Sequence, residues 1–112
     1  MFTYKSIADL SQRVADAARE IAGEKLEEVM LFGSYARGDY DDESDVDYIV
    51  VINCPAEELS KYSEQLCYPA SRLSLEYGVT VSISVADSGS FIRYKRHLPF
   101  YENVEREGIK IT

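Results

Sequence analysis

The sequence predicts one small α/β (α+β) domain, with a mixed sheet that carries helices mainly on one face. Segments with helical spacing of apolar residues alternate with short apolar runs typical of buried strands. The 112 residues suffice for one hydrophobic core but not for two. A composition of 46% hydrophobic and 29% charged residues is that of a soluble globular protein. We therefore expect residues 1–112 to form a single domain.

Helical periodicity marks two long segments. In residues 5–22, apolar side chains recur every three or four positions up to Gly23, which predicts an amphipathic helix. Residues 56–77 show a similar pattern, interrupted by Pro69. Because proline removes a helical hydrogen bond, we expect a bend there, with one helix to about Leu66 and a second piece ending at Tyr77. Further helical segments are predicted after residue 87 and over residues 100–107.

Apolar runs predict four strands. The expected strands cover residues 29–32, 46–52, 79–85 and, as an edge strand, 109–111. The third alternates strictly, so that Thr80, Ser82 and Ser84 share one polar face.

Charge and composition exclude several classes of function. Twelve basic and twenty acidic residues give a net charge of −8, which argues against binding of nucleic acid. No apolar stretch is long enough to span a bilayer and no signal peptide is recognisable, so we expect a cytoplasmic protein without a membrane contact. Cys54 and Cys67 are not spaced as zinc ligands, and we expect both to be buried or half-buried thiols.

Two carboxylates stand at the start of the second strand. Because side chains alternate along a strand, Asp45 and Asp47 point to the same side, about 6.5–7 Å apart. Arg37 is the nearest basic residue and can neutralise only one of them. Oxygen ligands without His or Cys favour Mg²⁺. The alternative interpretation is that the acids lie at an exposed strand start and only prevent aggregation through the strand edge.

A Gly-Ser pair ends the first strand. Gly33 allows a sharp turn, and Ser34 stands where it can cap a short helix through Tyr35, Ala36 and Arg37. Free N–H groups at such a helix start attract phosphate. A phosphate-binding turn opposite a carboxylate pair with Mg²⁺ is typical of phosphoryl or nucleotidyl transfer.

Gly33-Ser34, ten intervening residues and Asp45-x-Asp47, with Ala36-Arg37-Gly38 between them, resemble the signature of the DNA polymerase β-like nucleotidyltransferase superfamily. The sequence is most similar to its minimal members (MNT-type), small proteins often encoded as the antitoxin beside a HEPN toxin. The order of elements and the tail from Leu98 to Gly108 resemble that group too. The resemblance implies the nucleotidyltransferase fold.

The resemblance also implies roles for individual residues. Asp45 and Asp47 would bind Mg²⁺ and act in catalysis, Gly33 and Ser34 would hold the phosphates of ATP, and Arg37 would brace the loop or contact phosphate. The implied activity is transfer of AMP from ATP to a hydroxyl group, with a HEPN-type toxin as protein partner and antitoxin function as the outcome. Whether the chain forms homo- or hetero-oligomers stays open.

One position departs from the family pattern. A third carboxylate is usual on a neighbouring strand, and by position we expect it at Ser82. A serine hydroxyl adds no negative charge to activate a nucleophile. Glu76 and Asp87 lie nearby in sequence but off the polar face. The alternative hypothesis is therefore a catalytically weak or inactive binding module that neutralises its partner by direct contact.

Overall fold

The computed structural model describes residues 4–38, 45–94 and 109–111. The acidic run 39–43 and the predicted helix over residues 100–107 lie outside the described residues. The elements follow in this order: α1 (Tyr4–Ala22), the 3₁₀ turn η1 (Gly23–Lys25), β1 (Leu26–Phe32), α2 (Ser34–Arg37), β2 (Val46–Ile52), the 3₁₀ turn η2 (Ala56–Glu58), α3 (Leu59–Tyr77), β3 (Val81–Asp87), α4 (Ser88–Tyr94) and β4 (Ile109–Lys110).

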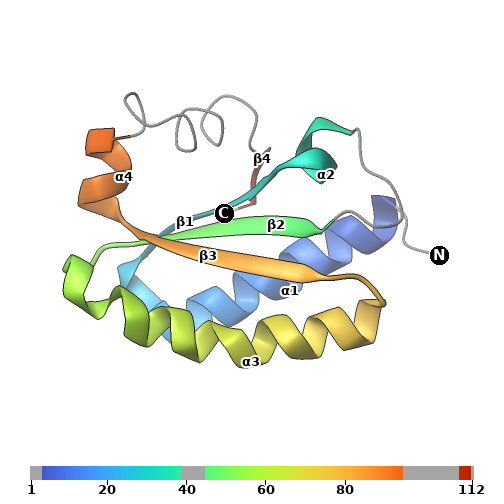
Figure 1. The fold of residues 1–112 in the computed structure, drawn as a ribbon, viewed down its shortest axis with the longest axis horizontal. Helices are drawn as coiled ribbons and strands as arrows, with labels where there is room; N and C mark the ends of the chain where they lie inside the picture. Colours follow the sequence, from blue (N-terminus) through green and yellow to red (C-terminus); the bar gives the residue numbers. More distant parts are fainter. Residues whose placement is uncertain (1–3, 39–44, 95–108, 112) are drawn as a thin grey trace.

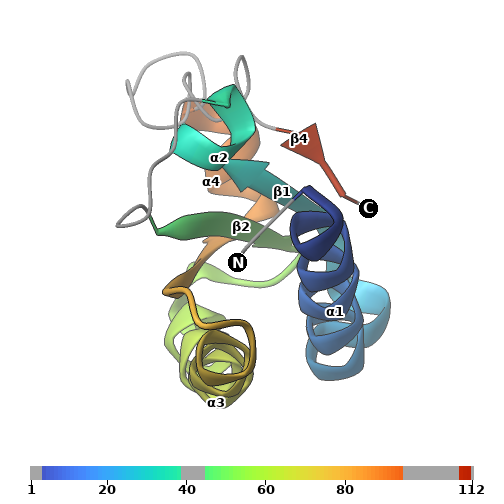
Figure 2. The same ribbon diagram turned by 90° about the vertical axis from the view of Figure 1, so that its right-hand side faces the viewer.

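The strands form one mixed sheet in the order β3-β2-β1-β4 (Figure 1). β1 is antiparallel to both β2 and β4, whereas β2 and β3 are parallel. A parallel pair needs a crossover connection, and α3 provides it. α1 and α3 lie on the same face of the sheet (Figure 2), and α4 packs on the opposite face through Phe91. The predicted fold class, a mixed sheet with its long helices on one face, is confirmed.

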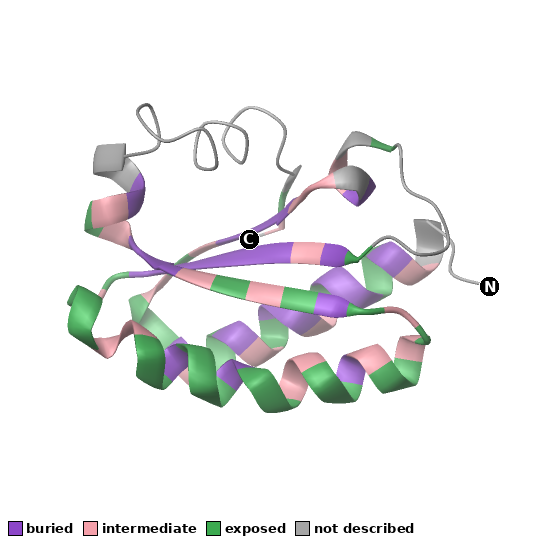
Figure 3. Cartoon of the chain, in the orientation of Figure 1, coloured by how far each residue is buried: buried purple, intermediate pink, exposed green. Residues whose placement is uncertain are grey.

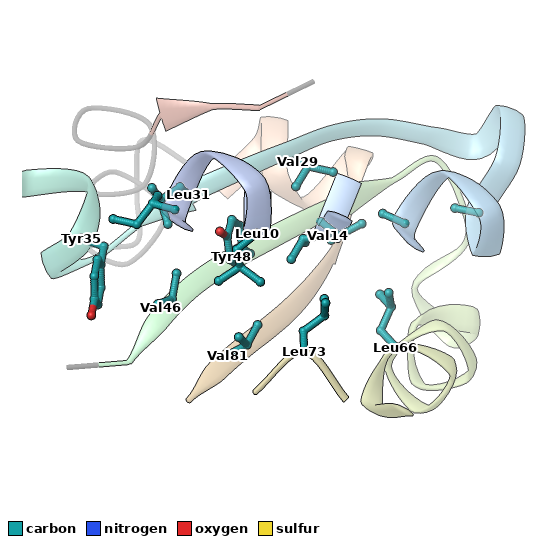
Figure 4. Packing of buried hydrophobic residues seen from close by; sticks show 14 of the residues in the cluster. Leu10, Val14, Val29, Leu31, Tyr35, Val46, Tyr48, Leu66, Leu73 and Val81 are labelled. Atoms are coloured by element: carbon teal, nitrogen blue, oxygen red, sulfur yellow. The ribbon is translucent and has the colours of Figure 1, made fainter. Parts of the chain in front are cut away.

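β2 is the centre of the core (Figure 3). Every second residue, from Val46 to Ile52, packs toward α1 and α3 in a cluster that includes Leu10, Val14 and Leu66 (Figure 4). The alternate residues Ile49 and Val51 pack on the other face against a second cluster. Asp47 is the one residue of β2 that is not buried. The polar position therefore stands out against a strand that is otherwise apolar on both faces.

The structure corrects the expected break at Pro69. α3 runs from Leu59 to Tyr77 with Pro69 inside it, and Gly78 ends it in a left-handed conformation with φ 69°. Buried residues on both sides of the proline, Tyr62 and Leu66 before it and Leu73 after it, hold the helix against the sheet. Tertiary packing thus outweighs the lost hydrogen bond.

Three smaller differences concern strand bounds and one cysteine. β1 begins at Leu26, three residues earlier than expected, and β3 is shifted two residues toward the C-terminus. Its last residue, Asp87, caps α4, because Oδ2 of Asp87 accepts a hydrogen bond from the Ser90 N–H at 2.9 Å. Cys54 is half-buried as predicted, but Cys67 is exposed because it lies on the outer side of α3.

A buried hydrogen bond joins α1 to the sheet. The hydroxyl groups of Ser11 and Tyr48 lie 2.8 Å apart, and both residues are buried. Burial raises the pKa of Tyr48 to about 12, so the phenol stays neutral. Within the part of the chain that the structure describes, no helix is long and apolar enough to cross a membrane.

We predict that Tyr48→Phe lowers the free energy of unfolding by about 1–2 kcal/mol, because the Ser11 hydroxyl loses its buried partner. Urea denaturation of Tyr48→Phe, Ser11→Ala and the double variant measures this. The double variant should lose about 1 kcal/mol less free energy of unfolding than the two single variants lose together. Strict additivity would show that the bond contributes nothing.

Candidate functional site

The candidate site lies where β1 ends and both β2 and β3 begin (Figure 1). In the antiparallel pair of β1 and β2, Phe32 is opposite Asp47. The residue after Phe32 is Gly33, so the Gly-Ser turn and the two aspartates meet at one end of the sheet. The structure therefore brings together the segments that the sequence motif separates.

Gly33 and Asp47 are in direct contact. A Cβ atom placed on Gly33 would lie 2.6 Å from Oδ2 of Asp47, closer than side chains approach one another. Gly33 also has φ 78°, a left-handed conformation that favours glycine. Sequence analysis predicted the sharp turn but missed the contact. Only a glycine lets the carboxylate lie directly against the turn.

α2 begins directly after this turn. It spans Ser34–Arg37 and is anchored by Tyr35, which is buried in the main core. The short helix confirms the predicted conformation after Gly33. The side chains of Ser34 and Arg37 lie outside the described part of the structure, so their predicted contacts with phosphate stay predictions.

Asp45 acts on the pKa of its neighbour Asp47. The pKa of Asp47 is raised, first because the carboxylate is partly buried and second because Asp45 is negatively charged. Asp45 itself is exposed just before β2. In the described part of the chain neither carboxylate forms an ion pair. Two neighbouring acids suit a divalent cation, and Mg²⁺ typically takes one or two carboxylates together with substrate phosphates.

Ser82 lies beside Asp47. The parallel register of β2 and β3 pairs these two residues, so Ser82 stands next to the carboxylate and is exposed. Glu76 is engaged elsewhere, in an ion pair with Arg13. Asp87 pairs with Ile52 at the far end of β3, about 16 Å from Ser82 along the strand. Neither acid reaches the position of a third carboxylate.

The described residues contain no group of three or more His, Cys, Asp or Glu that could hold a metal ion. Among the described residues, Asp45 and Asp47 are the carboxylates at the end of the sheet that Gly33 occupies. A groove of about 640 Å³ lies between α1 and α3, lined among others by Arg13, Glu20 and Arg72. These helices cover the face opposite Asp47, so this groove is separate from the carboxylates.

The class of protein follows from comparison with known sequences. The sequence profile of the nucleotidyltransferase domain family matches residues 11–111, almost the whole chain. The chain belongs to this family and is a nucleotidyltransferase. The resemblance inferred from the Gly33-Ser34 and Asp45-x-Asp47 spacing is thereby confirmed.

Two curated relatives come from the archaeon Methanocaldococcus jannaschii. One is named "Putative protein adenylyltransferase MJ0141" and is 37% identical over 93 residues, which cover 81% of this chain and 84% of the relative. The other, "Putative protein adenylyltransferase MJ0604", is 36% identical over 84 residues, covering 75% and 76%. Both alignments cover most of each protein, so the relationship extends beyond the motif.

Solved structures show the same fold at lower sequence identity. One similar chain comes from a crystal structure of a toxin-antitoxin with AMP-PNP (TM-score 0.56, 18% identity, covering 91% of this chain and 72% of that one). Another belongs to the tri-AMPylated Shewanella oneidensis HEPN toxin in complex with MNT antitoxin (TM-score 0.51, 17% identity, covering 92% and 69%). The nucleotidyltransferase fold predicted from the sequence is thus found in proteins of this kind.

We predict that Gly33→Ala lowers the free energy of unfolding more than Gly78→Ala does. Both glycines have positive φ, 78° and 69°, so both variants carry backbone strain of about 1 kcal/mol. Only the alanine at position 33 also displaces the Asp47 carboxylate, because nothing lies within 4 Å of a Cβ at Gly78. Chemical denaturation of both variants measures the difference. Equal losses would contradict the Gly33–Asp47 contact.

Proposed function

We propose that the protein transfers AMP from ATP to a hydroxyl group of a protein partner, in a reaction that depends on Mg²⁺. The observation that carries the proposal is the contact between the Asp47 carboxylate and the Gly33 turn, with Asp45 beside it. The names of the two archaeal relatives support protein adenylylation. The toxin-antitoxin complexes of similar fold support a HEPN-type partner and an antitoxin role.

Each residue of the site has a role in this proposal. Asp45 and Asp47 would hold Mg²⁺, and their shared negative charge explains why the pair needs a cation. The metal, when bound, neutralises phosphate charge and polarises the phosphoryl group. Backbone N–H groups at Gly33 and Ser34 would bind the outer phosphates of ATP. Arg37 at the end of α2 would brace the turn or contact phosphate.

The proposed reaction replaces one bond to phosphorus by another. The acceptor oxygen bonds to the α-phosphorus, the bond from this phosphorus to the bridging oxygen breaks, and pyrophosphate leaves. The acceptor hydroxyl gives its proton to solvent water in this step. Ser82 stands next to Asp47 but offers no carboxylate that could accept this proton or hold a metal ion that activates the acceptor. We therefore expect slow chemistry with a site that still binds nucleotide.

Ser82 also favours a second candidate function. A nucleotidyltransferase fold that lacks the third carboxylate could act as a binding module, which neutralises its partner by covering it. In that case the partner would be neutralised without becoming labelled. The two candidates differ in whether the carboxylate pair is needed for protection.

We predict that Asp45→Asn combined with Asp47→Asn abolishes transfer of label from α-³²P-labelled ATP to a co-purified HEPN-type partner. The change removes both charges that would hold the metal but keeps the shape of the side chains. Asp9→Asn combined with Asp16→Asn, which removes two exposed charges from α1, is the matched control and should retain transfer. A double variant at the site that still transfers label would refute the catalytic roles. Protection by that variant without any label would favour the binding module.

We predict that Ser82→Asp increases the rate of label transfer by about 10- to 100-fold, because it adds a carboxylate next to Asp47. Ser60→Asp adds the same charge at an exposed position of α3 and should leave the rate unchanged. Single-turnover assays at saturating ATP and Mg²⁺ compare the three proteins. A rate for Ser82→Asp at or below that of the unchanged chain would show that this position is not where the third carboxylate acts.

A further inference from the structure

β3 forms one edge of the sheet, with backbone groups that no described strand pairs. The N–H of Val46 donates to the carbonyl oxygen of Thr80 at 2.8 Å. Along a parallel strand, the backbone N–H and C=O groups of every second residue face the same neighbouring strand. The backbone groups of Thr80, Ser82 and Ser84 therefore face β2. The C=O groups of the alternate residues Val81, Ile83 and Val85 then point away from β2, as do the N–H groups of Ile83 and Val85. The N–H of Val81 instead donates to Oγ of Ser74 on α3 at 2.9 Å.

This edge lacks the features that usually protect an exposed strand. Residues 81–86 include no charged residue and no proline. The seven residue pairs from Val46–Val81 to Ile52–Asp87 continue without a bulge. Exposed edges of this length and regularity normally pair with another strand or carry protective charges. The regular, uncharged edge therefore suits pairing with a further strand.

An uncharged groove lies along this edge. It has a volume of about 580 Å³ and is lined by ten residues of α3 and the β3 region. None of the ten is charged, although charged residues make up 29% of the chain. Leu75, which is 86% exposed, is one of these residues, together with Cys67 and Ile83. Depletion of charge at a surface that exposes a large apolar side chain is typical of the centre of a protein interface.

The strand sequence is symmetric. Val81-Ser82-Ile83-Ser84-Val85 reads the same in both directions. A twofold axis at Ile83 would pair Ile83 with itself, Val81 with Val85 and Ser82 with Ser84 across two antiparallel strands. Ile83 and Val85 direct both backbone groups outward and Val81 directs its C=O group outward, as hydrogen-bonded antiparallel pairs at these positions require. The palindromic sequence and these outward backbone groups thus favour the same register.

We propose that a second copy of the chain pairs with β3 in this antiparallel register, so that two four-stranded sheets form one continuous sheet. Two copies that each carry a net charge of −8 repel each other, and this repulsion is weakest where they meet through an uncharged surface such as the groove beside β3. Ser84 of the second copy would lie opposite Ser82, at the border of the site that contains Asp47.

Light scattering coupled to size-exclusion chromatography tests the proposal at about 100 μM protein, a concentration at which moderate affinities populate a dimer. The unchanged chain should have twice the monomer mass of 12.7 kDa. Ser84→Lys and Leu75→Lys place charges in the contact at exposed positions and should each return the mass to that of the monomer. Tyr68→Lys is the matched control, because Tyr68 is 73% exposed on α3 but does not line this groove.

A dimer that Tyr68→Lys leaves intact and both other lysine variants dissociate supports the proposal. A monomeric unchanged chain would overturn the proposal, even if a segment of another protein pairs with this edge instead. A dimer that survives Ser84→Lys would overturn it as well, as would one that only Tyr68→Lys dissociates. Circular dichroism spectra that match the unchanged chain confirm that each variant is folded.

Discussion

The candidate site depends on the contact between Gly33 and the carboxylate of Asp47. β1 ends and β2 begins at this point, and a Cβ at position 33 would lie 2.6 Å from the carboxylate oxygen. The contact holds the Gly33 turn, which is proposed to bind phosphate, next to the acid. Binding sites gain affinity when such groups are already in position, because less ordering is needed on binding. The spacing of the motif therefore reflects a packing requirement as well as chemistry.

Fully buried residues flank the partly buried Asp47. Asp47 is only partly buried and its pKa is raised, yet its neighbours Val46 and Tyr48 are fully buried. Because side chains alternate along β2, one residue can belong to the site while the next anchors the strand to α1 through Ser11. The unfavourable burial of the Asp47 carboxylate is thus offset by the packing of its neighbours Val46 and Tyr48.

Much of this arrangement was predictable from sequence, for identifiable reasons. Strong periodicity predicted α1 and β2 with accurate bounds, and the spacing of Gly33-Ser34 and Asp45-x-Asp47 predicted which segments meet. The expected break at Pro69 was wrong, because local propensity does not register packing through Leu66 and Leu73. The place of Ser82 beside Asp47 was correctly expected. The contact of Gly33 with Asp47 depends on the exact positions of atoms in two paired strands, which a sequence pattern does not contain.

A crystal structure of the chain with Mg²⁺ and a non-hydrolysable ATP analogue tests the central claim most directly. We predict one Mg²⁺ ion at about 2.0–2.1 Å from oxygens of both Asp45 and Asp47, shared with the phosphates of the analogue. The outer phosphates should accept hydrogen bonds from the backbone N–H groups that follow Gly33. A nucleotide bound away from this corner, for example in the groove between α1 and α3, would contradict the account.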